Sequence, residues 1–231
     1  MVKALLARTA LFRGATKAQL AAIAERCAVR DVTRGEVVVG RGERLAGICA
    51  VSHGMLKLCF RHAPGDERVM RLVEAGEIFG EASALLDRPV SYDVCALAPT
   101  RLVVVPVASV YQLIEQDPLA AHRTVHQLAE RCQALLAELE ARSHTGAQRL
   151  AAYLESLARP SARNGAWSAH LPATKTVIAS RLDMKKETFS RLLRALADQG
   201  VISVAQRDIT ILDRGRLAAL AEADGLGPVA G

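Results

Sequence analysis

The sequence predicts an α+β chain: an antiparallel β-barrel or jelly roll first, then one long helix, then a small helical domain. Three observations predict this order. Short β-branched runs separated by Gly, Pro and Asp fill residues 27–107, as in antiparallel barrels rather than βαβ folds. An apolar repeat with alternating spacings of four and three follows Asp117. Two short amphipathic helical patterns and a hairpin pattern then occupy residues 174–212.

Composition limits the class of protein. The 231 residues, 51% of them apolar, can bury a core in one large or two small domains. A net charge of +6 and a pI of about 9.3 favour a polyanionic partner. No segment reaches the length of an uncharged membrane span, and the basic, apolar start of the chain has no cleavage site. We therefore expect a cytoplasmic protein without a membrane partner.

The sequence contains no recognisable catalytic or metal-binding motif. Its cysteines are dispersed and include no CxxC pair: Cys27, Cys49, Cys59, Cys95 and Cys132. This pattern argues against a disulfide framework and against a clustered zinc site. A nucleophile elbow, a P-loop, an HExxH pair and a dinucleotide fingerprint are all missing. We expect no enzyme, no catalytic residues and no bound metal.

The N-terminal part is expected to begin with one or two helices over residues 1–26, the second capped by Thr16. Six strands are predicted at residues 36–39, 47–52, 54–60, 67–73, 91–97 and 101–107. The stretch APGDE at residues 63–67 is predicted as a hairpin turn, because Pro fixes one φ and Gly supplies an open one.

The long helix carries a heptad seam. Its apolar positions are spaced 4, 3, 4, 3 and 4: Ala121, Val125, Leu128, Cys132, Leu135 and Leu139. Charged residues outside the seam favour a dimer coil, although the pattern also fits one helix packed on its own domain. In a dimer, Cys132 would face its symmetry mate, and it either forms an interchain disulfide or packs as a small apolar residue.

The C-terminal part predicts two helices with a tight corner between them. After a helix at 143–158 and a polar loop at 159–172, residues 174–182 and 183–200 form the pair. The second helix has one apolar side, formed by Phe189, Leu192, Leu193 and Leu196. Asp183 tolerates the positive φ that the corner requires, and Gly200 is a left-handed cap. Residues 201–212 predict a β-hairpin, the wing of a winged helix.

The other side of that helix is charged, which also fits an ordinary solvated surface. The 172–216 segment, however, carries nine Lys/Arg against five Asp/Glu, a difference of +4, as expected of a duplex binder. The order of barrel, long helix and winged helix resembles the Crp/Fnr family of transcription regulators. Residues 187–217, ETFSRLLRALADQGVISVAQRDITILDRGRL, are similar to its DNR-like branch, which responds to nitrogen oxides.

The resemblance implies three domains. Residues 1–113 would be an effector-sensing, cyclic-nucleotide-binding-like barrel, residues 114–145 a dimerisation helix, and residues 146–231 a winged helix-turn-helix. The implied function is a DNA-binding activator controlled by a small effector, with RNA polymerase as a further partner. The alternative is a ligand-binding barrel that acts through a protein partner rather than DNA.

The candidate base-reading residues are Glu187, Ser190 and Arg191, at positions i, i+3 and i+4 of one helix face. Arg can bond guanine O6 and N7, Glu can accept from cytosine N4, and Ser suits several bases. The resemblance implies that they read TTGAT-type half-sites of a palindrome, about 10–10.5 bp apart for a homodimer. Phosphate contacts are expected at Thr174, Lys175, Lys185, Lys186 and Arg194.

Residues 76–94, GEIFGEASALLDRPVSYDV, resemble the phosphate-binding cassette of cyclic-nucleotide domains. Val90 stands where an Arg would clamp the phosphate, and we therefore expect that cyclic AMP is not the effector. Leu135 and Leu136 replace the hydroxyls that an adenine needs. The expected pocket is apolar, lies between barrel and long helix, and includes Gly80, Glu81, Ser91, Arg131, Leu135 and Leu136.

The resemblance also makes haem a candidate cofactor, because the DNR-like branch is associated with haem and nitric oxide. His122 and His126, at i and i+4 on the long helix, are the candidate ligands, unless they simply face solvent. Thr9, Ala10 and Arg181 stand where the DNR-like pattern has histidines, which weakens this transfer. An iron–sulfur cluster is not expected, because Cys27 stands alone near the N-terminus.

Overall fold

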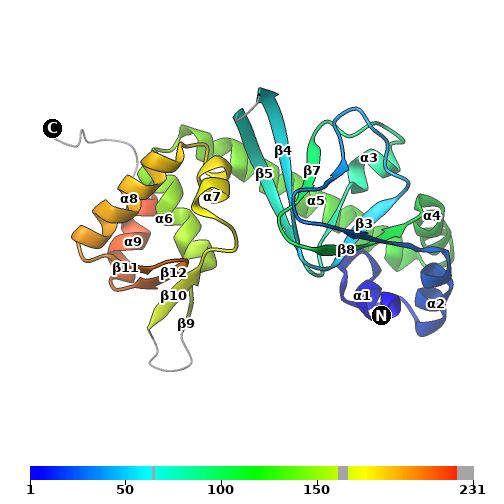
Figure 1. The fold of residues 1–231 in the computed structure, drawn as a ribbon. Helices are drawn as coiled ribbons and strands as arrows, with labels where there is room; N and C mark the ends of the chain where they lie inside the picture. Colours follow the sequence, from blue (N-terminus) through cyan, green and yellow to red (C-terminus); the bar gives the residue numbers. More distant parts are fainter. Residues whose placement is uncertain (64–65, 161–165, 223–231) are drawn as a thin grey trace. The chain divides into compact units, whose positions relative to one another are not determined.

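The computed structural model of the chain describes residues 1–63, 66–160 and 166–222 (Figure 1). The chain divides into two compact units, residues 1–134 and 135–231. Within the described ranges, no helix is both long enough and apolar enough to cross a bilayer.

The first unit is built on two antiparallel four-stranded sheets, with strand orders β1-β8-β3-β6 and β2-β7-β4-β5 (Figure 1). The strands are β1 (Ala28–Val32), β2 (Val37–Val39), β3 (Ile48–His53), β4 (Met55–Ala63), β5 (Asp66–Glu74), β6 (Ile78–Phe79), β7 (Asp93–Ala96) and β8 (Thr100–Val105). The predicted α+β class and jelly roll are confirmed. The sequence did not predict β1 or β6, and the tip of the predicted turn at residues 63–67 lies outside the described residues.

The core of the first unit follows strand alternation. Leu56 and Leu58 of β4 and Phe79 of β6 point into one apolar cluster, where each is at most 3% exposed. A second cluster joins the N-terminal helices to the sheet β1-β8-β3-β6, with Phe12 and Ile48 fully buried. One apolar layer therefore lies between the two sheets, and a second lies between one sheet and the helices.

The helices of the first unit are α1 (Val2–Arg8), η1 (Ala10–Phe12), α2 (Lys17–Arg26), α3 (Glu81–Leu85), α4 (Val107–Gln116) and the long α5 (Pro118–Glu140), which runs on into the second unit. The cap predicted at Thr16 is confirmed: its Oγ1 accepts a hydrogen bond from the Gln19 amide at 3.2 Å, and the Thr16 amide donates to Gln19 Oε1 at 2.8 Å. At the start of α5, Asp117 accepts from the Leu119 amide at 3.0 Å and from Arg123 at 2.7 Å.

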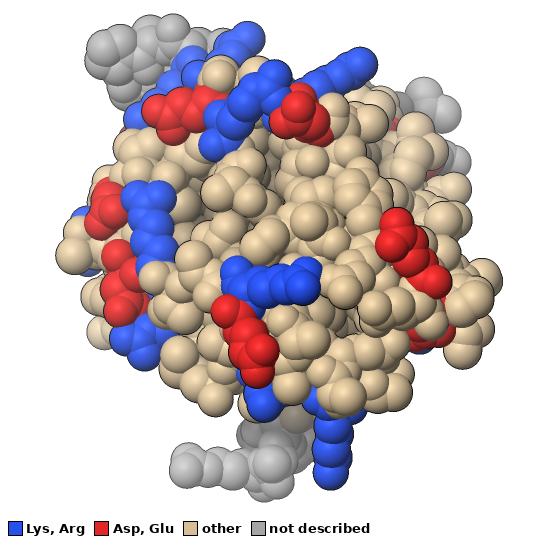
Figure 2. All heavy atoms as spheres, turned by 90° about the vertical axis from the view of Figure 1, so that its right-hand side faces the viewer, with Lys and Arg blue, Asp and Glu red and all other residues tan. Residues whose placement is uncertain are grey.

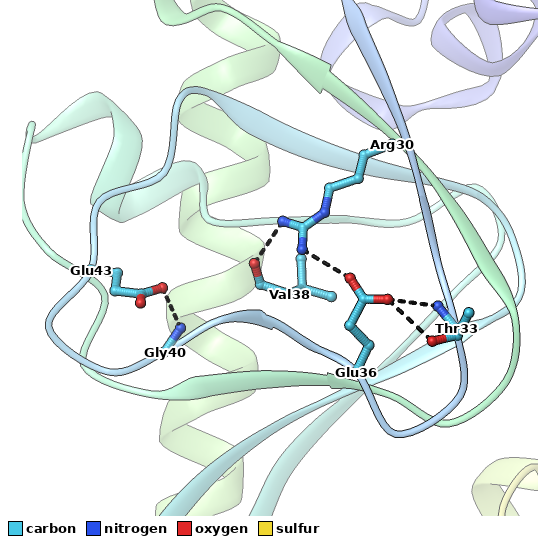
Figure 3. A network of polar contacts seen from close by, with 6 residues as sticks. All are labelled: Arg30, Thr33, Glu36, Val38, Gly40 and Glu43. Atoms are coloured by element: carbon cyan, nitrogen blue, oxygen red, sulfur yellow. Dashed lines mark hydrogen bonds and ion pairs between the residues drawn. The ribbon is translucent and has the colours of Figure 1, made fainter.

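The connection from β1 to β2 is held by side chains rather than by apolar packing (Figure 3). Glu36 accepts from the Thr33 amide at 2.9 Å and pairs with Arg30 at 3.1 Å. Arg30 also donates to the Val38 carbonyl at 2.8 Å, so one guanidinium bridges the turn and the following strand. The hydrogen bond from Thr33 is the main reason why the pKa of Glu36 lies below its usual value.

The second unit packs helices against a small sheet of order β11-β12-β10-β9. Its elements are η2 (Ala141–Ser143), α6 (Gly146–Leu157), β9 (Arg159–Pro160), β10 (Trp167–His170), α7 (Lys175–Arg181), α8 (Lys186–Asp198), β11 (Ile202–Ala205), β12 (Asp208–Ile211) and α9 (Arg214–Glu222). The polar loop predicted at 159–172 is wrong at its two ends, where β9 and β10 pair with each other; its residues 161–165 lie outside the described ranges.

The predicted helix pair and wing are present. Asp183 has a φ of 55° in the corner between α7 and α8, and Gly200 has a φ of 68° after α8. Positive φ is a conformation that Asp and Gly adopt more easily than most residues. Strands β11 and β12 form the hairpin, with Ala205 opposite Asp208. The second unit is therefore a winged helix-turn-helix.

Candidate nucleic-acid interface and effector cleft

Helix α8 separates an apolar side from a polar side. Phe189, Leu193 and Leu196 are at most 6% exposed and pack into the second unit. The predicted base-reading residues Glu187, Ser190 and Arg191 are all exposed. Their hydroxyl, carboxylate and guanidinium groups therefore face solvent together, as a groove-reading helix requires.

Four of the five predicted phosphate contacts lie at the two helix starts, and Arg194 lies further along α8. Lys185 is the N-cap residue of α8, and Lys186 and Arg194 are exposed on the same helix. At the start of α7, Lys175 is half-buried and the Thr174 hydroxyl accepts from the Val177 amide at 3.4 Å. This hydroxyl already caps α7, so its amide end is ordered without a ligand.

The corner between α7 and α8 is held by a residue that the sequence analysis missed. Arg149 of α6 donates to the carbonyls of Leu182 at 2.8 Å, Asp183 at 3.3 Å and His144 at 2.5 Å. One guanidinium thus ties the corner to the segment that precedes α6. In the sequence, Arg149 is one of two charges within an amphipathic helix pattern, which does not reveal long-range carbonyl partners.

Charge is distributed differently in different parts of the chain. On the face shown in Figure 2, Lys and Arg side chains stand beside Asp and Glu side chains, with uncharged surface between these groups. The 172–216 segment instead has its excess of +4, from nine basic and five acidic residues. The long-range attraction for a polyanion is therefore expected at the helix-turn-helix.

The predicted dimer seam on α5 is exposed over much of its length. Val125 is 66% exposed, Leu135 41% and Leu139 53%, and Cys132 is also exposed. Ala121 and Leu128 are half-buried. Apolar side chains at these spacings form a continuous stripe along one side of a helix, and a stripe exposed to this degree is typical of an interaction surface.

The cassette-like segment is filled by apolar side chains. Val90 is 1% exposed and belongs to the core cluster of the sandwich. Gly80 has a φ of 81°, and a Cβ built on it would come within 2.2 Å of Leu45. Leu45 and Tyr92 pack partly buried against the same cluster, and burial raises the pKa of Tyr92 to about 12. Arg88 and Ser91, in contrast, are exposed.

A cleft of about 340 Å³ opens beside this segment in the first unit. It is lined by Arg8, Thr9, Ala10, Arg13, Arg71, Gly76, Glu77, Ile78, Glu81, Gln127, Glu130, Arg131 and Ala134. The lining carries four arginines and three glutamates, whereas the sequence predicted an apolar pocket. Within the described structure, the buried Oε1 of Gln127 has no hydrogen-bond partner.

Of the predicted pocket residues, Glu81 and Arg131 line this cleft. Gly80 is the N-cap of α3, and Leu135 and Leu136 are exposed on α5. These roles stay predictions.

The haem ligands that the resemblance implies do not meet in this cleft. Its lining includes Thr9 and Ala10 and contains no His or Cys, the usual axial ligands. His122 and His126 are exposed, and His126 lies 3.5 Å from Glu130. The residues that line the cleft therefore do not fit a haem.

Two family models match the chain in the order of its units. The model "Cyclic nucleotide-binding domain" matches residues 29–117, and the model "Crp-like helix-turn-helix domain" matches residues 148–220. The first covers the sandwich, and the second covers the elements from α6 to α9.

Individual proteins match over nearly the whole chain. The Cyclic AMP receptor protein of Thermus thermophilus is 28% identical over 81% of this chain and 85% of its own. A CRP-like cAMP-activated global transcriptional regulator of Mycobacterium tuberculosis is 25% identical over 93% of this chain and 97% of its own. A crystal structure from Ruegeria pomeroyi, described as a candidate cyclic nucleotide binding protein, is 30% identical, covers 96% of this chain and 98% of its own, and has a TM-score of 0.61. With a cyclic-nucleotide-binding-type sandwich, a long helix and a Crp-like helix-turn-helix in that order, the chain belongs to the Crp/Fnr family of transcription regulators.

Proposed function

We propose that this regulator is a transcription activator that binds a TTGAT-type palindrome as a homodimer through α8. The observation that carries the proposal is the division of α8 into two sides. Its apolar side is buried, and Glu187, Ser190 and Arg191 are exposed together. These three groups can bond cytosine N4, several base edges and guanine O6/N7 in a major groove.

Fluorescence anisotropy with labelled duplexes tests the operator. One duplex carries two TTGAT half-sites about 10–10.5 bp apart, and its control has the same composition in scrambled order. We expect the palindrome to bind at least about 1,000-fold more tightly than the control, with affinity that falls steeply as salt rises. Equal affinity for both duplexes would contradict the operator. Undetectable binding of either, in every effector state, would favour the alternative of a barrel that acts through a protein partner.

The homodimer is supported by the exposed stripe on α5. A two-fold mate would cover Val125 and Leu139, which are 66% and 53% exposed, and burial of such side chains is favourable. Val125→Glu and Leu139→Glu should each shift the protein toward monomer in sedimentation velocity. Gln133→Glu, an exposed change outside the seam of the same helix, should not. A wild-type protein that stays monomeric at high concentration would contradict the homodimer.

The effector is proposed to be a small polar molecule, other than cyclic AMP, in the cleft beside α5. The cleft is lined by arginine and glutamate side chains, which can pair with charged and polar groups of a ligand. Cyclic AMP is disfavoured because Val90 and Leu45 leave no charge or space where its phosphate would need a clamp.

Calorimetry should detect no cyclic AMP binding in the micromolar range, and binding there would overturn this part of the proposal. Native mass spectrometry and an absorption spectrum of anoxically purified protein identify what co-purifies. A stoichiometric haem with a Soret band would contradict a small polar effector in the cleft.

A further inference from the structure

The sheet β2-β7-β4-β5 brings together two cysteines that are far apart in the sequence. In its register, Lys57 lies opposite Cys95 and Cys59 lies opposite Asp93, so the two cysteines are diagonal neighbours on adjacent strands. Both are on the side of the sheet that faces away from the sandwich core, because Leu58 and Val94 next to them point into that core.

Two cations lie next to this pair. Arg61 Nη2 donates to Cys95 Sγ at 2.5 Å, and the Lys57 side chain, directly across the ladder, also forms an ion pair with Glu67. The sulfurs are almost inaccessible, with Cys59 0% and Cys95 3% exposed. The Arg61 side chain is 44% exposed. A small reagent would therefore reach Cys95 from the side of this half-exposed guanidinium, which also lies 3.8 Å from Asp93.

The environment of Cys95 differs from that of the other buried thiols. The hydrogen bond from Cys59 and the charges of Arg61 and Lys57 lower the pKa of Cys95 to about 7, in spite of its burial. Burial alone raises the pKa of Cys27 to about 11, and burial is the main reason why the pKa of Cys49 rises to about 12. The hydrogen bond to Cys95 and burial raise the pKa of Cys59 well above its usual value. Near neutral pH, Cys95 is thus the thiolate of the pair and Cys59 holds the proton.

We propose that Cys95 and Cys59 form an oxidisable dithiol, in which Cys95 reacts with a hydroperoxide and Cys59 closes a disulfide. The Cys95 thiolate attacks the terminal oxygen of ROOH, the O–O bond breaks, and the leaving alkoxide takes a proton to become ROH. Cys95 is oxidised by two electrons to a sulfenic acid. The Cys59 sulfur then attacks Cys95, the S–O bond breaks, and water leaves with the Cys59 proton. Two thiols and ROOH become one disulfide, ROH and H2O.

The strands have room for this closure, because both cysteines lie beside irregularities in the ladders. The β4–β5 register shifts between Leu58 and Cys59, and the β2–β7 register shifts between Val37 and Val39, next to the Val37–Cys95 pair. Such bulges bend strands locally and relax the regular spacing. Diagonal neighbours in a regular sheet are about 7–8 Å apart, somewhat beyond the usual Cα separation of a disulfide, so this local freedom is what the disulfide needs.

The test uses the full-length protein and one equivalent of hydrogen peroxide at pH 7.5, followed by alkylation, digestion and mass spectrometry. We expect a loss of 2 Da and a cross-linked peptide that joins Cys59 to Cys95. In Cys59→Ser, a dimedone adduct should appear on Cys95. In Cys95→Ser, Cys59 should carry no adduct. Oxidation of Cys27, Cys49 or Cys132 while Cys59 and Cys95 stay reduced would overturn the proposal, as would a Cys59→Ser protein without an adduct on Cys95.

A second measurement needs no loss of either cysteine. The rate of Cys95 alkylation by iodoacetamide should rise with pH to a midpoint near 7, as its lowered pKa requires. Cys49, with its pKa raised to about 12, is the internal control and should react at least about 1,000-fold more slowly at pH 7.5. Arg61→Ala should move the Cys95 midpoint upward, and Arg61→Lys should restore most of it. If the alkylation midpoint of Cys95 lay near the ordinary pKa of a thiol, and Arg61→Ala did not move it, Cys95 would be an ordinary thiol and the proposal would fail.

Discussion

Helix α8 and the cassette-like segment 76–94 are the two parts of the chain where the family's chemistry should be visible, and they differ. On α8, the groups able to bond bases are exposed: Glu187, Ser190 and Arg191. In the cassette-like segment, the position of the phosphate clamp is held by Val90, which is 1% exposed in the core. Helix α8 thus exposes groups that can bond bases, whereas a buried apolar residue stands where the resemblance implies a phosphate clamp.

This difference indicates for which of the two units a function can be inferred from the relatives. The winged helix can be tested at a few positions, because a helix needs only a few exposed side chains to read a groove. The sandwich keeps the fold but not the clamp, and fold alone does not determine a ligand. Experiments that measure a property of each unit independently therefore test this difference between the two units.

The largest expected effect separates the stabilities of the two units. Phe189→Ala should destabilise the second unit by about 3–5 kcal/mol, because a fully buried ring is replaced by a cavity. The fluorescence of Trp167, the single tryptophan, reports on this unit: its ring lies 3.7 Å below the Arg214 guanidinium. The measurement is urea unfolding followed by that signal.

The matched control is Phe79→Ala, which removes an equally buried ring from the sandwich. It should leave the Trp167 transition in place and increase the reactivity of the buried sandwich thiol Cys49 toward an aromatic disulfide reagent. If both changes moved the Trp167 transition equally, the units would unfold as one, and the contrast between separate modules would fail.

A smaller effect is expected at the corner of the helix pair. Arg149→Met keeps most of the aliphatic volume but removes the donors to Leu182 and His144, which lie at 2.8 and 2.5 Å. Hydrogen bonds from a charged donor typically contribute about 1.5–3 kcal/mol. We expect a loss of that order in the Trp167-monitored stability, with DNA binding weakened about equally for all sequences. Arg142→Met, at an exposed position of η2, is the control; an equal loss in both variants would rule out a clamp.

The base-reading role should show as a change in specificity more than in stability. Arg191→Ala should cost about 1–3 kcal/mol on the palindrome and little on the scrambled duplex, because a bidentate base contact is lost. Arg194→Ala, one turn further along α8, should weaken both duplexes alike and lower the salt dependence by about one counterion. Anisotropy titrations at several salt concentrations measure both. If Arg194→Ala reduced specificity and Arg191→Ala weakened both duplexes alike, the groove-facing side of α8 would have been assigned wrongly.

A feature could be predicted from the sequence when the residues that form it lie close together along the chain. The α8 face, the Asp183 corner and the Gly200 cap follow from neighbours within one or two helical turns. Strand β1 was missed because its residues are exposed except Val32, which leaves no alternating pattern. The contact of Cys59 with Cys95 was missed as well, because strand register places them together and spacing in the sequence does not indicate it.

The smallest expected effect tests the start of α5, where the first unit begins its long helix. The hydrogen bond from Arg123 holds the pKa of Asp117 below its usual value. The folded state thus favours the ionised carboxylate, and this contribution is present above the unfolded pKa and is lost as the pH falls through the folded pKa. The protection factors of α5 amides, in which the pH dependence of intrinsic amide exchange is divided out, should therefore fall on acidification in the wild type. Asp117→Asn should already exchange faster at neutral pH and lose part of that acid dependence. Trp167 fluorescence in the second unit should not distinguish the two proteins, and a shared change would show that the start of α5 is coupled to the DNA-binding unit.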